Sequence, residues 1–320
     1  MTSPVAPHTP RVALLGLGDI GAGWAALAAA HGWTTALFDT DVHAADRATG
    51  LVARRARALA ALGRADADTV ERGLRRVKVA RSLLQAVGDA DWVIESVPED
   101  LALKQRVLEN VGQVARPGVI YTSSSSGLPM SEIAARYKDQ AHCAVAHPLN
   151  PPELIPLVEV VPGKFTAQET LDTVRDWLRA LGRIPIVLKR EVPGNAVGRI
   201  AAAVWRECID LVLTGVMDVD DIDRAVSLGP GLGWAAGGPH LTYHLGAGDG
   251  GVEAFLQQLL QSFEIWWGSL AQWTKLEPEQ VHALTAQIEK AYGAKVDALR
   301  EARDRRLAAI LKALEAARKG

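Results

Sequence analysis

The sequence has few cysteines, no excess of charge of either sign and no apolar stretch at its beginning. Two cysteines, Cys143 and Cys208, exclude a disulfide scaffold and favour a reducing compartment, the cytoplasm. The 35 Lys and Arg residues nearly balance the 37 Asp and Glu residues, so no overall field would attract nucleic acid or an acidic membrane. Prolines interrupt residues 1–11, which argues against a signal peptide.

Residues 20–38 carry no charge, and nineteen such residues reach the lower limit for a transmembrane helix. Glycine, histidine and threonine interrupt this segment, and its two ends fit a nucleotide-binding motif better. We therefore expect a protein that does not enter the membrane.

Short apolar runs alternate with amphipathic stretches through the first 190 residues. This alternation predicts a mostly parallel sheet with helices on both faces, the doubly wound Rossmann-type arrangement of an α/β protein. The predicted strands are residues 11–16, 34–38, 77–80, 92–97, 119–123, 143–147, 157–161 and 184–188. The predicted helices are residues 20–31, 42–62 and 167–181, with two more beginning near Leu101 and Ser131.

The pattern becomes helical after Glu191–Gly194, which predicts a Rossmann domain over residues 1–190 and an all-helical domain over 191–320. Within the second domain, Gly229–Gly238 is predicted to be a loop. The charged segment Gln280–Lys319 predicts an amphipathic helix that is either solvated or packed on a partner subunit. The other predicted helices are residues 197–213, 218–227 and 252–267.

A G-x-G-x-x-G turn follows the first predicted strand and opens the first predicted helix. Its glycines suit a tight turn, a close approach of backbone to a pyrophosphate, and close packing of helix on strand. Asp39, after the second predicted strand, is placed to bind the adenosine ribose and to repel a 2′-phosphate, which favours NAD over NADP. The alternative is a glycine turn in an unrelated α/β domain. The residues of the turn are Gly16, Leu17, Gly18, Asp19, Ile20 and Gly21.

Two further polar segments follow predicted strands. Glu99 could bind the second ribose of the dinucleotide, and Lys104, one helical turn later, could reach the same sugar. Acids at the start of a helix are equally explained by the helix dipole. The hydroxyls of Thr122–Ser126 could bind a polar ligand, but they could also satisfy the backbone of their own turn.

His147 ends an apolar strand and precedes proline. A histidine at the carboxyl edge of the sheet, beside a dinucleotide, is a candidate general acid and base. Glu159 lies in an apolar run twelve residues later and needs a partner there. A pair of the two would fix the imidazole tautomer, although a purely structural pair remains the alternative. His240 and His244 lack a third ligand, and we predict no metal site.

Taken in order, these motifs resemble the L-3-hydroxyacyl-CoA dehydrogenase superfamily. The strings GLGDIG, ESVPEDLALK, SSSSGL, AHPLNPP, PLVEVV, KREVPG and GPHLTYHLG carry the resemblance, which is closest to the branch with L-gulonate 3-dehydrogenase (lambda-crystallin) and carnitine dehydrogenase. The resemblance implies that His147, Glu159 and Ser126 form the catalytic set and that Asn150 shapes the site. It also implies that backbone near Ser124 contacts NAD, as do Glu99 and Lys104. The helical domain would complete the substrate pocket and form a homodimer.

The sequence departs from this family where side chains surround the substrate. Asn195 stands at a bulky aromatic position and Gly198 at the position of an asparagine, while Gly233 and Gly237 stand where relatives carry larger residues. We therefore predict an NAD-dependent dehydrogenase of a 3-hydroxy acid or 3-hydroxyacyl substrate, with an enlarged pocket. The alternatives are a ketoreductase for a bulky β-keto compound and a non-enzymatic, crystallin-like protein that retains NAD binding.

Overall fold

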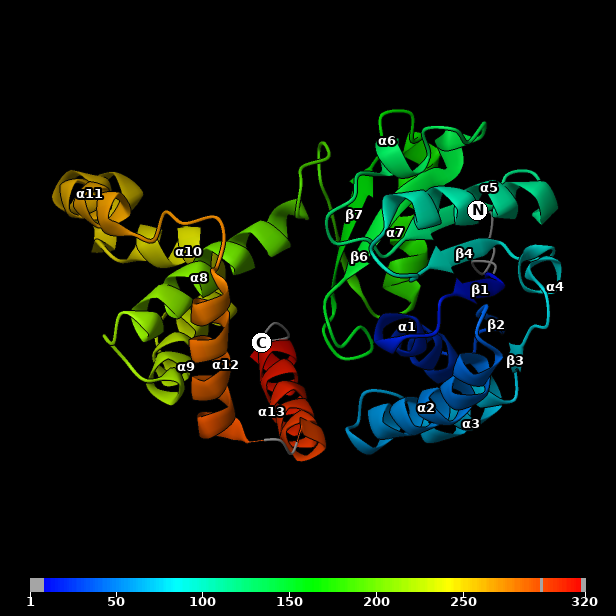
Figure 1. Ribbon diagram of the computed structural model, residues 1–320, viewed down its shortest axis with the longest axis horizontal. Helices are drawn as coiled ribbons and strands as arrows, with labels where there is room; N and C mark the ends of the chain where they lie inside the picture. The colour runs from blue at the N-terminus through cyan, green and yellow to red at the C-terminus, as the bar shows by residue number, and fades with distance from the viewer. Residues whose placement is uncertain (1–8, 294–295, 318–320) are drawn as a thin grey trace. The chain divides into compact units, whose positions relative to one another are not determined.

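The computed structural model describes residues 9–293 and 296–317 (Figure 1). An eight-stranded sheet has the order β3-β2-β1-β4-β5-β6-β7-β8, and every neighbouring pair is parallel except β6 and β7, which are antiparallel. The predicted doubly wound α/β class is confirmed. The strands are β1 (Val12–Leu15), β2 (Thr35–Phe38), β3 (Val77–Val79), β4 (Trp92–Glu95), β5 (Ile120–Ser123), β6 (Cys143–Pro148), β7 (Leu157–Pro162) and β8 (Ile184–Val187).

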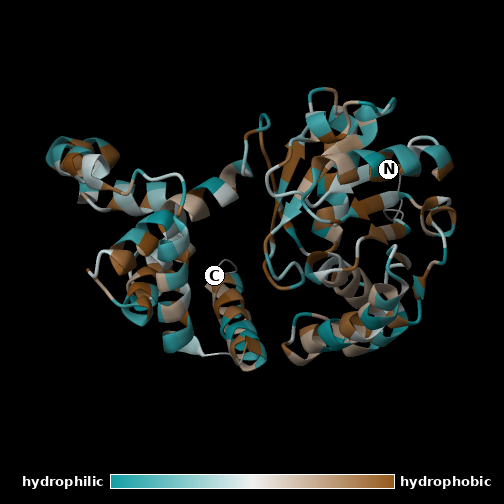
Figure 2. Cartoon of the chain, in the orientation of Figure 1, coloured by the Kyte–Doolittle hydropathy of each residue, from teal (hydrophilic) through white to brown (hydrophobic). Residues whose placement is uncertain are grey.

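The two faces of the sheet bury alternate residues of the same strands, as the period of two requires. In β1, Val12 and Leu14 pack into one apolar cluster, and Ala13 and Leu15 pack into the other. Hydrophobic residues run along the strands in Figure 2. The helices around this sheet are α1 (Asp19–Ala30), α2 (Val42–Ala61), α3 (Ala67–Leu74), α4 (Leu83–Val87), α5 (Leu101–Val114), α6 (Met130–Ile133) and α7 (Gln168–Ala180).

Helix α1 explains the uncharged run in the sequence. Ten consecutive residues, 21–30, are buried against the sheet and its neighbouring helices. Gly73 of α3 approaches so closely that a Cβ there would lie 1.8 Å from the Ala29 carbonyl oxygen. Within the described residues, no helix is long and apolar enough to cross a membrane. Helices α3 and α4 were not predicted, because each is too short to show a helical period of its own.

The chain forms two compact units that divide at Arg199 and Ile200. Residues 191–199, assigned above to the helical domain, therefore belong to the sheet unit. Helix α8 (Asn195–Leu213) begins in the first unit and continues into the second. The remaining helices are α9 (Val219–Leu228), α10 (Pro230–Leu245), α11 (Gly251–Ser269), α12 (Pro278–Tyr292) and α13 (Val296–Ala317).

Two predictions for the second unit are corrected. Gly229–Gly238 is not a loop, because α10 starts at Pro230, a residue suited to the first turn of a helix. Its helical course is interrupted at Gly238, whose φ is 78°. The tail is two helices rather than one, since Gly293, with φ of 67°, ends α12. Lys319, its predicted end, lies outside the described residues.

Candidate active site

The glycine turn after β1 combines two glycines required by packing with one that faces open space. Gly16 has φ of 85°, and a Cβ there would lie 2.7 Å from the backbone of Ser96. A Cβ on Gly21 would lie 1.9 Å from the Gly16 carbonyl oxygen. A Cβ on Gly18 would have no neighbour within 4 Å. The backbone at Gly18, where α1 begins, is therefore accessible to an anionic group such as a pyrophosphate.

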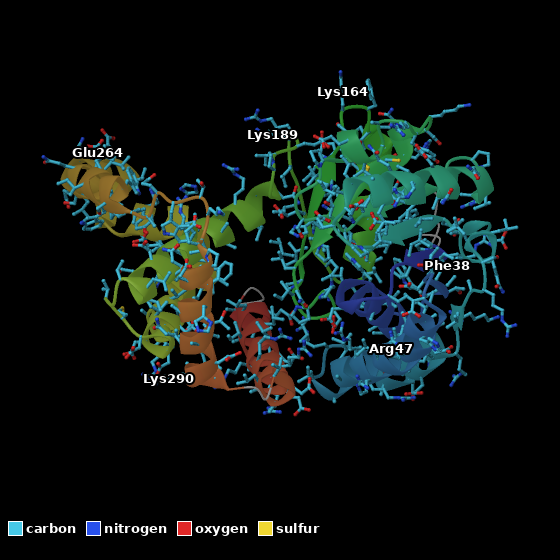
Figure 3. All side chains as sticks on the ribbon, in the orientation of Figure 1. Phe38, Arg47, Lys164, Lys189, Glu264 and Lys290 are labelled. Carbon is cyan, nitrogen blue, oxygen red and sulfur yellow. The ribbon has the colours of Figure 1, made fainter. Side chains whose placement is uncertain are left out.

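Asp39 connects this turn to the end of β2 through hydrogen bonds. Its Oδ2 accepts a hydrogen bond from the Leu17 N–H at 2.8 Å, and its Oδ1 accepts one from the Asp41 N–H at 3.0 Å. Each carboxylate oxygen keeps a second lone pair for a ribose hydroxyl. Asp39 also borders a cavity of about 170 Å³, whose largely apolar wall includes Phe38, labelled in Figure 3. An acid beside an apolar cavity and an open helix start fits the adenosine part of NAD.

Asp19 and its neighbours have a supporting contact that the sequence did not predict. Arg55 of α2 donates to the Asp19 carboxylate and to the Asp19 carbonyl oxygen, both at 2.6 Å. It also lies 3.5 Å from Glu153. Arg55 therefore ties α2 to the start of α1. Ile20, the other predicted cofactor contact of the turn, packs against the core beneath it.

The Lys104 side chain is buried and paired with a carboxylate. Its side chain is 1% exposed, and its Nζ donates to the buried Glu95 carboxylate at 2.8 Å. Glu95 also accepts bonds from the Ser123 hydroxyl at 2.7 Å and the Tyr121 hydroxyl at 3.3 Å. Burial and the Glu95 charge raise the pKa of Tyr121, so its hydroxyl remains a donor. The Nζ of Lys104 also donates to the Val97 carbonyl oxygen at 3.1 Å and lies 3.5 Å from Glu99 Oε2, the carboxylate predicted to bind the same sugar.

Glu99 holds the loop that follows β5. Its Oε1 accepts bonds from the Ser125 hydroxyl at 2.6 Å, the Ser126 N–H at 3.1 Å and the Gly127 N–H at 2.9 Å. Partial burial alone would raise the pKa of Glu99, but the Ser125 bond, the backbone bonds and nearby Lys104 outweigh it, so the pKa is lowered. In this structure, Glu99 supports the loop after β5. Its contact with NAD remains a prediction.

His147, Glu159 and Ser126 lie together, as the sequence predicted for the first two. Residues 147 and 159 face each other across the antiparallel β6 and β7. The Nδ1 of His147 lies 2.8 Å from Glu159 Oε2, and its Nε2 lies 3.1 Å from Ser126 Oγ. An ionised carboxylate only accepts hydrogen bonds, so Nδ1 carries the proton in the neutral imidazole and Nε2 presents a lone pair. Such an Nε2 can take a proton from a substrate hydroxyl.

Glu159 has a second role that sequence reasoning missed. The side chain is completely buried, and its Oε1 accepts bonds from the N–H groups of Ala196 and Val197 at 2.8 and 2.9 Å. These groups belong to the first turn of α8, which lacks intrahelical partners for them. One carboxylate therefore orients His147 and anchors the helix that leads to the second unit. The sequence contains only two signals for this contact: the strand that carries Glu159 and the helix that begins near Asn195.

The other predicted residues take different positions. Ser124 Oγ accepts a hydrogen bond from the Trp24 indole at 3.2 Å and lies 2.9 Å from Ser96 Oγ, so the hydroxyl is hydrogen-bonded within the protein. Asn150 is exposed just past the end of β6. Asn195 is 6% exposed, and its carboxamide donates a hydrogen bond to the Ser126 carbonyl oxygen, so this side chain does not face open space. A Cβ on Gly198 would have no neighbour within 4 Å.

The residues predicted in the second unit lie on α10. A Cβ on Gly233 would meet open space, and one on Gly237 would lie 3.0 Å from the Leu241 side chain. His244 Nδ1 accepts a bond from the Val252 N–H at 3.1 Å and so fixes the start of α11. Among residues 9–293 and 296–317, no cluster of three potential metal ligands occurs.

The open glycine turn, the acid at the end of β2 and the His147–Glu159 pair define a Rossmann-type NAD-dependent dehydrogenase. The sequence model for the 3-hydroxyacyl-CoA dehydrogenase NAD binding domain matches residues 11–192, and that for the C-terminal domain of the same family matches residues 194–282. The chain belongs to the 3-hydroxyacyl-CoA dehydrogenase family. It is an NAD-dependent oxidoreductase that acts on the CH–OH group of a 3-hydroxy substrate.

Several individual proteins are similar to this chain, and two of those reported next cover at least 95% of it. An L-carnitine dehydrogenase of Nocardiopsis dassonvillei is 38% identical over 98% of this chain and 94% of its own length. Among solved structures, an NAD⁺-dependent 5-formyl-3-hydroxy-2-methylpyridine 4-carboxylic acid 5-dehydrogenase is 30% identical, with a TM-score of 0.79 over 95% of this chain and 98% of its own. A diketoreductase that acts on dicarbonyl compounds is 26% identical, with a TM-score of 0.63 over 80% and 93%.

Proposed function

We propose that this enzyme oxidises the 3-hydroxyl of a small 3-hydroxy acid, with L-carnitine as the first candidate, and reduces the 3-keto acid in reverse. The observation that carries this proposal is the position of His147, with Nδ1 bound to a buried carboxylate and Nε2 beside a serine hydroxyl. The 38% identity to an L-carnitine dehydrogenase supports the choice of substrate.

The proton steps follow from the orientation of the imidazole. In oxidation, His147 Nε2 removes the proton of the substrate hydroxyl, and Ser126 Oγ hydrogen-bonds the same oxygen. The Glu159 carboxylate stabilises the imidazolium that forms, because it stays 2.8 Å from Nδ1. In reduction, Nε2 returns the proton to the carbonyl oxygen. The glycine turn and Asp39 would hold NAD, which would supply the hydride acceptor for oxidation and, in its reduced form, the hydride donor for reduction.

We infer that Gly16–Gly21 and Asp39 hold the cofactor and that Asp39 selects NAD over NADP. The N–H groups at the start of α1 suit the pyrophosphate, with Gly18 open toward it. Glu99 and Ser124 lie in the segments that follow the neighbouring strands β4 and β5, and they are proposed to border the nicotinamide half. This assignment rests on the position of the carboxyl ends of parallel strands, where such sheets bind their ligands.

The test is a comparison of L-carnitine, 3-hydroxybutyrate and 3-hydroxybutyryl-CoA, each with NAD and with NADP. NADH absorbance measures turnover, and fluorescence titration measures cofactor binding separately. We expect NAD-dependent oxidation of a free 3-hydroxy acid that disappears in His147→Ala. Binding of NAD without turnover of any of these compounds or of their 3-keto forms would support a non-enzymatic, crystallin-like role instead.

A second candidate is the reduction of a bulky β-keto compound. The open space at Gly198 and the 26% identity to a diketoreductase favour it. A larger substrate would gain about 25 cal/mol per Å² of apolar surface removed from water if it filled that space. Gly198→Asn should then lower kcat/KM for bulky ketones and leave kcat/KM for short linear ketones unchanged. Faster turnover of short substrates by the wild type would contradict the enlarged pocket, which Asn195, Gly233 and Gly237 were also predicted to create.

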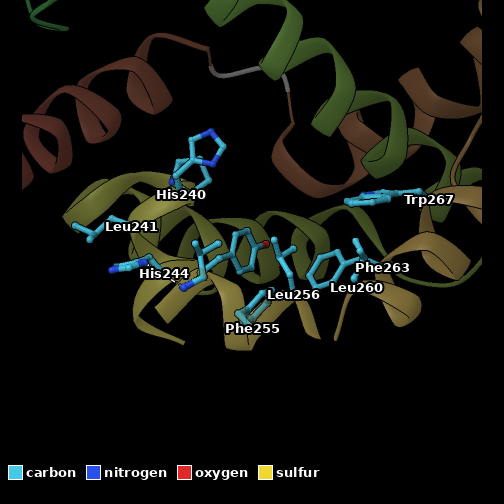
Figure 4. Close-up of a pocket in the computed structure, with 11 residues that line it drawn as sticks. His240, Leu241, His244, Phe255, Leu256, Leu260, Phe263 and Trp267 are labelled. Atoms are coloured by element: carbon cyan, nitrogen blue, oxygen red, sulfur yellow. Dashed lines mark hydrogen bonds between the residues drawn. The ribbon is translucent and has the colours of Figure 1, made fainter. Parts of the chain in front are cut away.

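We further propose a homodimer formed through the helical unit. An apolar groove of about 780 Å³ lies between α10 and α11 (Figure 4), and Trp267 on its wall is 54% exposed. Burying such a surface against a second copy removes it from water. Trp267→Glu should shift the sedimentation coefficient toward that of the monomer. Leu84→Glu, an equally exposed apolar position in the first unit, is the control.

Dimerisation that survives Trp267→Glu would contradict this groove as the interface.

We also infer a cytoplasmic location, because Cys143 and Cys208 are both free thiols, and a reducing compartment keeps thiols free. Fractionation of cells that express the full chain tests this location.

A further inference from the structure

The loop that carries Ser126 is held from two sides. On one side, Glu99 accepts from the N–H groups of Ser126 and Gly127. On the other, the Asn195 carboxamide donates to the carbonyl oxygen of Ser126 at 3.3 Å, with the Ser125 carbonyl oxygen 3.5 Å away. Both partners act on the backbone and leave the Ser126 hydroxyl directed at His147. Asn195 is thus in a position to control where that hydroxyl lies.

The backbone of Asn195 reaches the other side of His147. Asn195 has φ of 49° and follows Gly194, whose φ is 77°. Asparagine is one of the few residues other than glycine that adopts this left-handed conformation. This turn brings the next two N–H groups onto Glu159 Oε1. One buried residue therefore supports both groups that contact the imidazole, Ser126 at Nε2 and Glu159 at Nδ1.

We propose that Asn195 is a positioning residue for His147. Its carboxamide positions the Ser126 loop, and its left-handed backbone places the start of α8 on Glu159. This proposal rests on the proposed dehydrogenase function. It replaces the prediction that Asn195 merely leaves space for substrate. Asn195 does not touch the reacting groups, so the effect of its carboxamide should pass through Ser126.

Two variants separate the carboxamide from the backbone. Asn195→Gly keeps the left-handed conformation accessible and removes the donor. Asn195→Asp keeps the size and shape but sets a carboxylate against two carbonyl oxygens. The loss of one neutral hydrogen bond predicts a fall in kcat of about 2- to 10-fold for Asn195→Gly. Asn195→Asp should lose more, and KM for NAD should stay unchanged in both. Ala202→Gly, which adds the same backbone freedom at an exposed position of α8, is the matched control.

A double-mutant cycle with Ser126→Ala decides whether Asn195 acts through Ser126. We expect Asn195→Gly to have no further effect on kcat in the Ser126→Ala background. Independent, multiplying losses would overturn the proposal, as would a wild-type kcat in Asn195→Gly.

A measurement without turnover separates this proposal from the proposed function. In full-length protein with ¹⁵N-labelled histidine, the Nε2 resonance of His147 should move toward that of an unbonded imidazole in Asn195→Gly and Ser126→Ala alike. The Nδ1 resonance should stay, because Glu159 still binds it. An unchanged Nε2 resonance in Asn195→Gly would overturn the positioning role. An inactive wild type with the expected shifts would contradict the dehydrogenase function alone.

Discussion

Replacing Glu159 by glutamine changes one carboxylate that has three hydrogen bonds to make. Glutamine keeps a single acceptor oxygen, whereas the site contains the His147 Nδ1–H and the N–H groups of Ala196 and Val197. We expect the amide oxygen to turn to the two backbone donors of α8, since they outnumber the one on His147. The amide NH₂ then faces Nδ1, which must become the acceptor. The imidazole proton moves to Nε2, where it blocks proton uptake from the substrate.

The magnitude follows from the charge-assisted hydrogen bond that the carboxylate makes and the amide cannot make. A hydrogen bond to a charged group contributes about 1.5–3 kcal/mol, and this one strengthens as the imidazolium forms. Since about 1.4 kcal/mol corresponds to a tenfold change in rate, kcat of Glu159→Gln should fall about 10- to 150-fold. If the amide turned the other way, its NH₂ would meet two buried N–H donors, and the loss would appear as a lower Tm.

The assay is kcat and Tm measured in parallel on wild type, Glu159→Gln and Glu132→Gln. Glu132 is exposed on α6, so its substitution changes the net charge equally without touching His147. A Glu159→Gln enzyme with kcat within about twofold of wild type and an unchanged Tm would refute the reasoning. The His147–Glu159 contact would then be structural only.

Three further outcomes are expected. His147→Ala should lower kcat about 10²- to 10⁴-fold while NAD titration shows unchanged binding, and near-normal turnover would assign the proton to another group. Asp39→Ala should weaken NAD binding and reduce the preference of the enzyme for NAD over NADP, measured as the ratio of the two kcat/KM values. Equal use of both cofactors by the wild type would contradict the role of Asp39. The lowered pKa of Glu99 stabilises the fold above the ordinary carboxyl value of 4.5, and that contribution disappears as pH falls through the lowered pKa. The Tm difference between wild type and Glu99→Gln should accordingly be largest near neutral pH and shrink in acid; a difference independent of pH would exclude this carboxylate as its source.

Local sequence patterns were sufficient for the strands, the glycine turn and the pairing of His147 with Glu159. Each of these depends on neighbours in the chain or on a simple period: apolar runs that need burial, glycines at positive φ, and a charged residue in an apolar strand that needs a partner. Antiparallel pairing of β6 and β7 then places residues 147 and 159 opposite each other. The sequence by itself thus determined the class of fold, the glycine turn after β1 and the His147–Glu159 pair.

The tertiary structure alone decided which partner each remaining polar side chain takes. The Lys104 ammonium donates to the buried Glu95 carboxylate, and the Asn195 carboxamide donates to the Ser126 carbonyl oxygen, 69 residues earlier in the chain. Hydrogen bonds of this kind depend on the distance between elements in space, which strand order and helix packing set and which no local pattern records. A buried lysine or asparagine satisfies whichever acceptor the fold brings within about 3 Å, because leaving it unpaired would cost more than any local preference can supply.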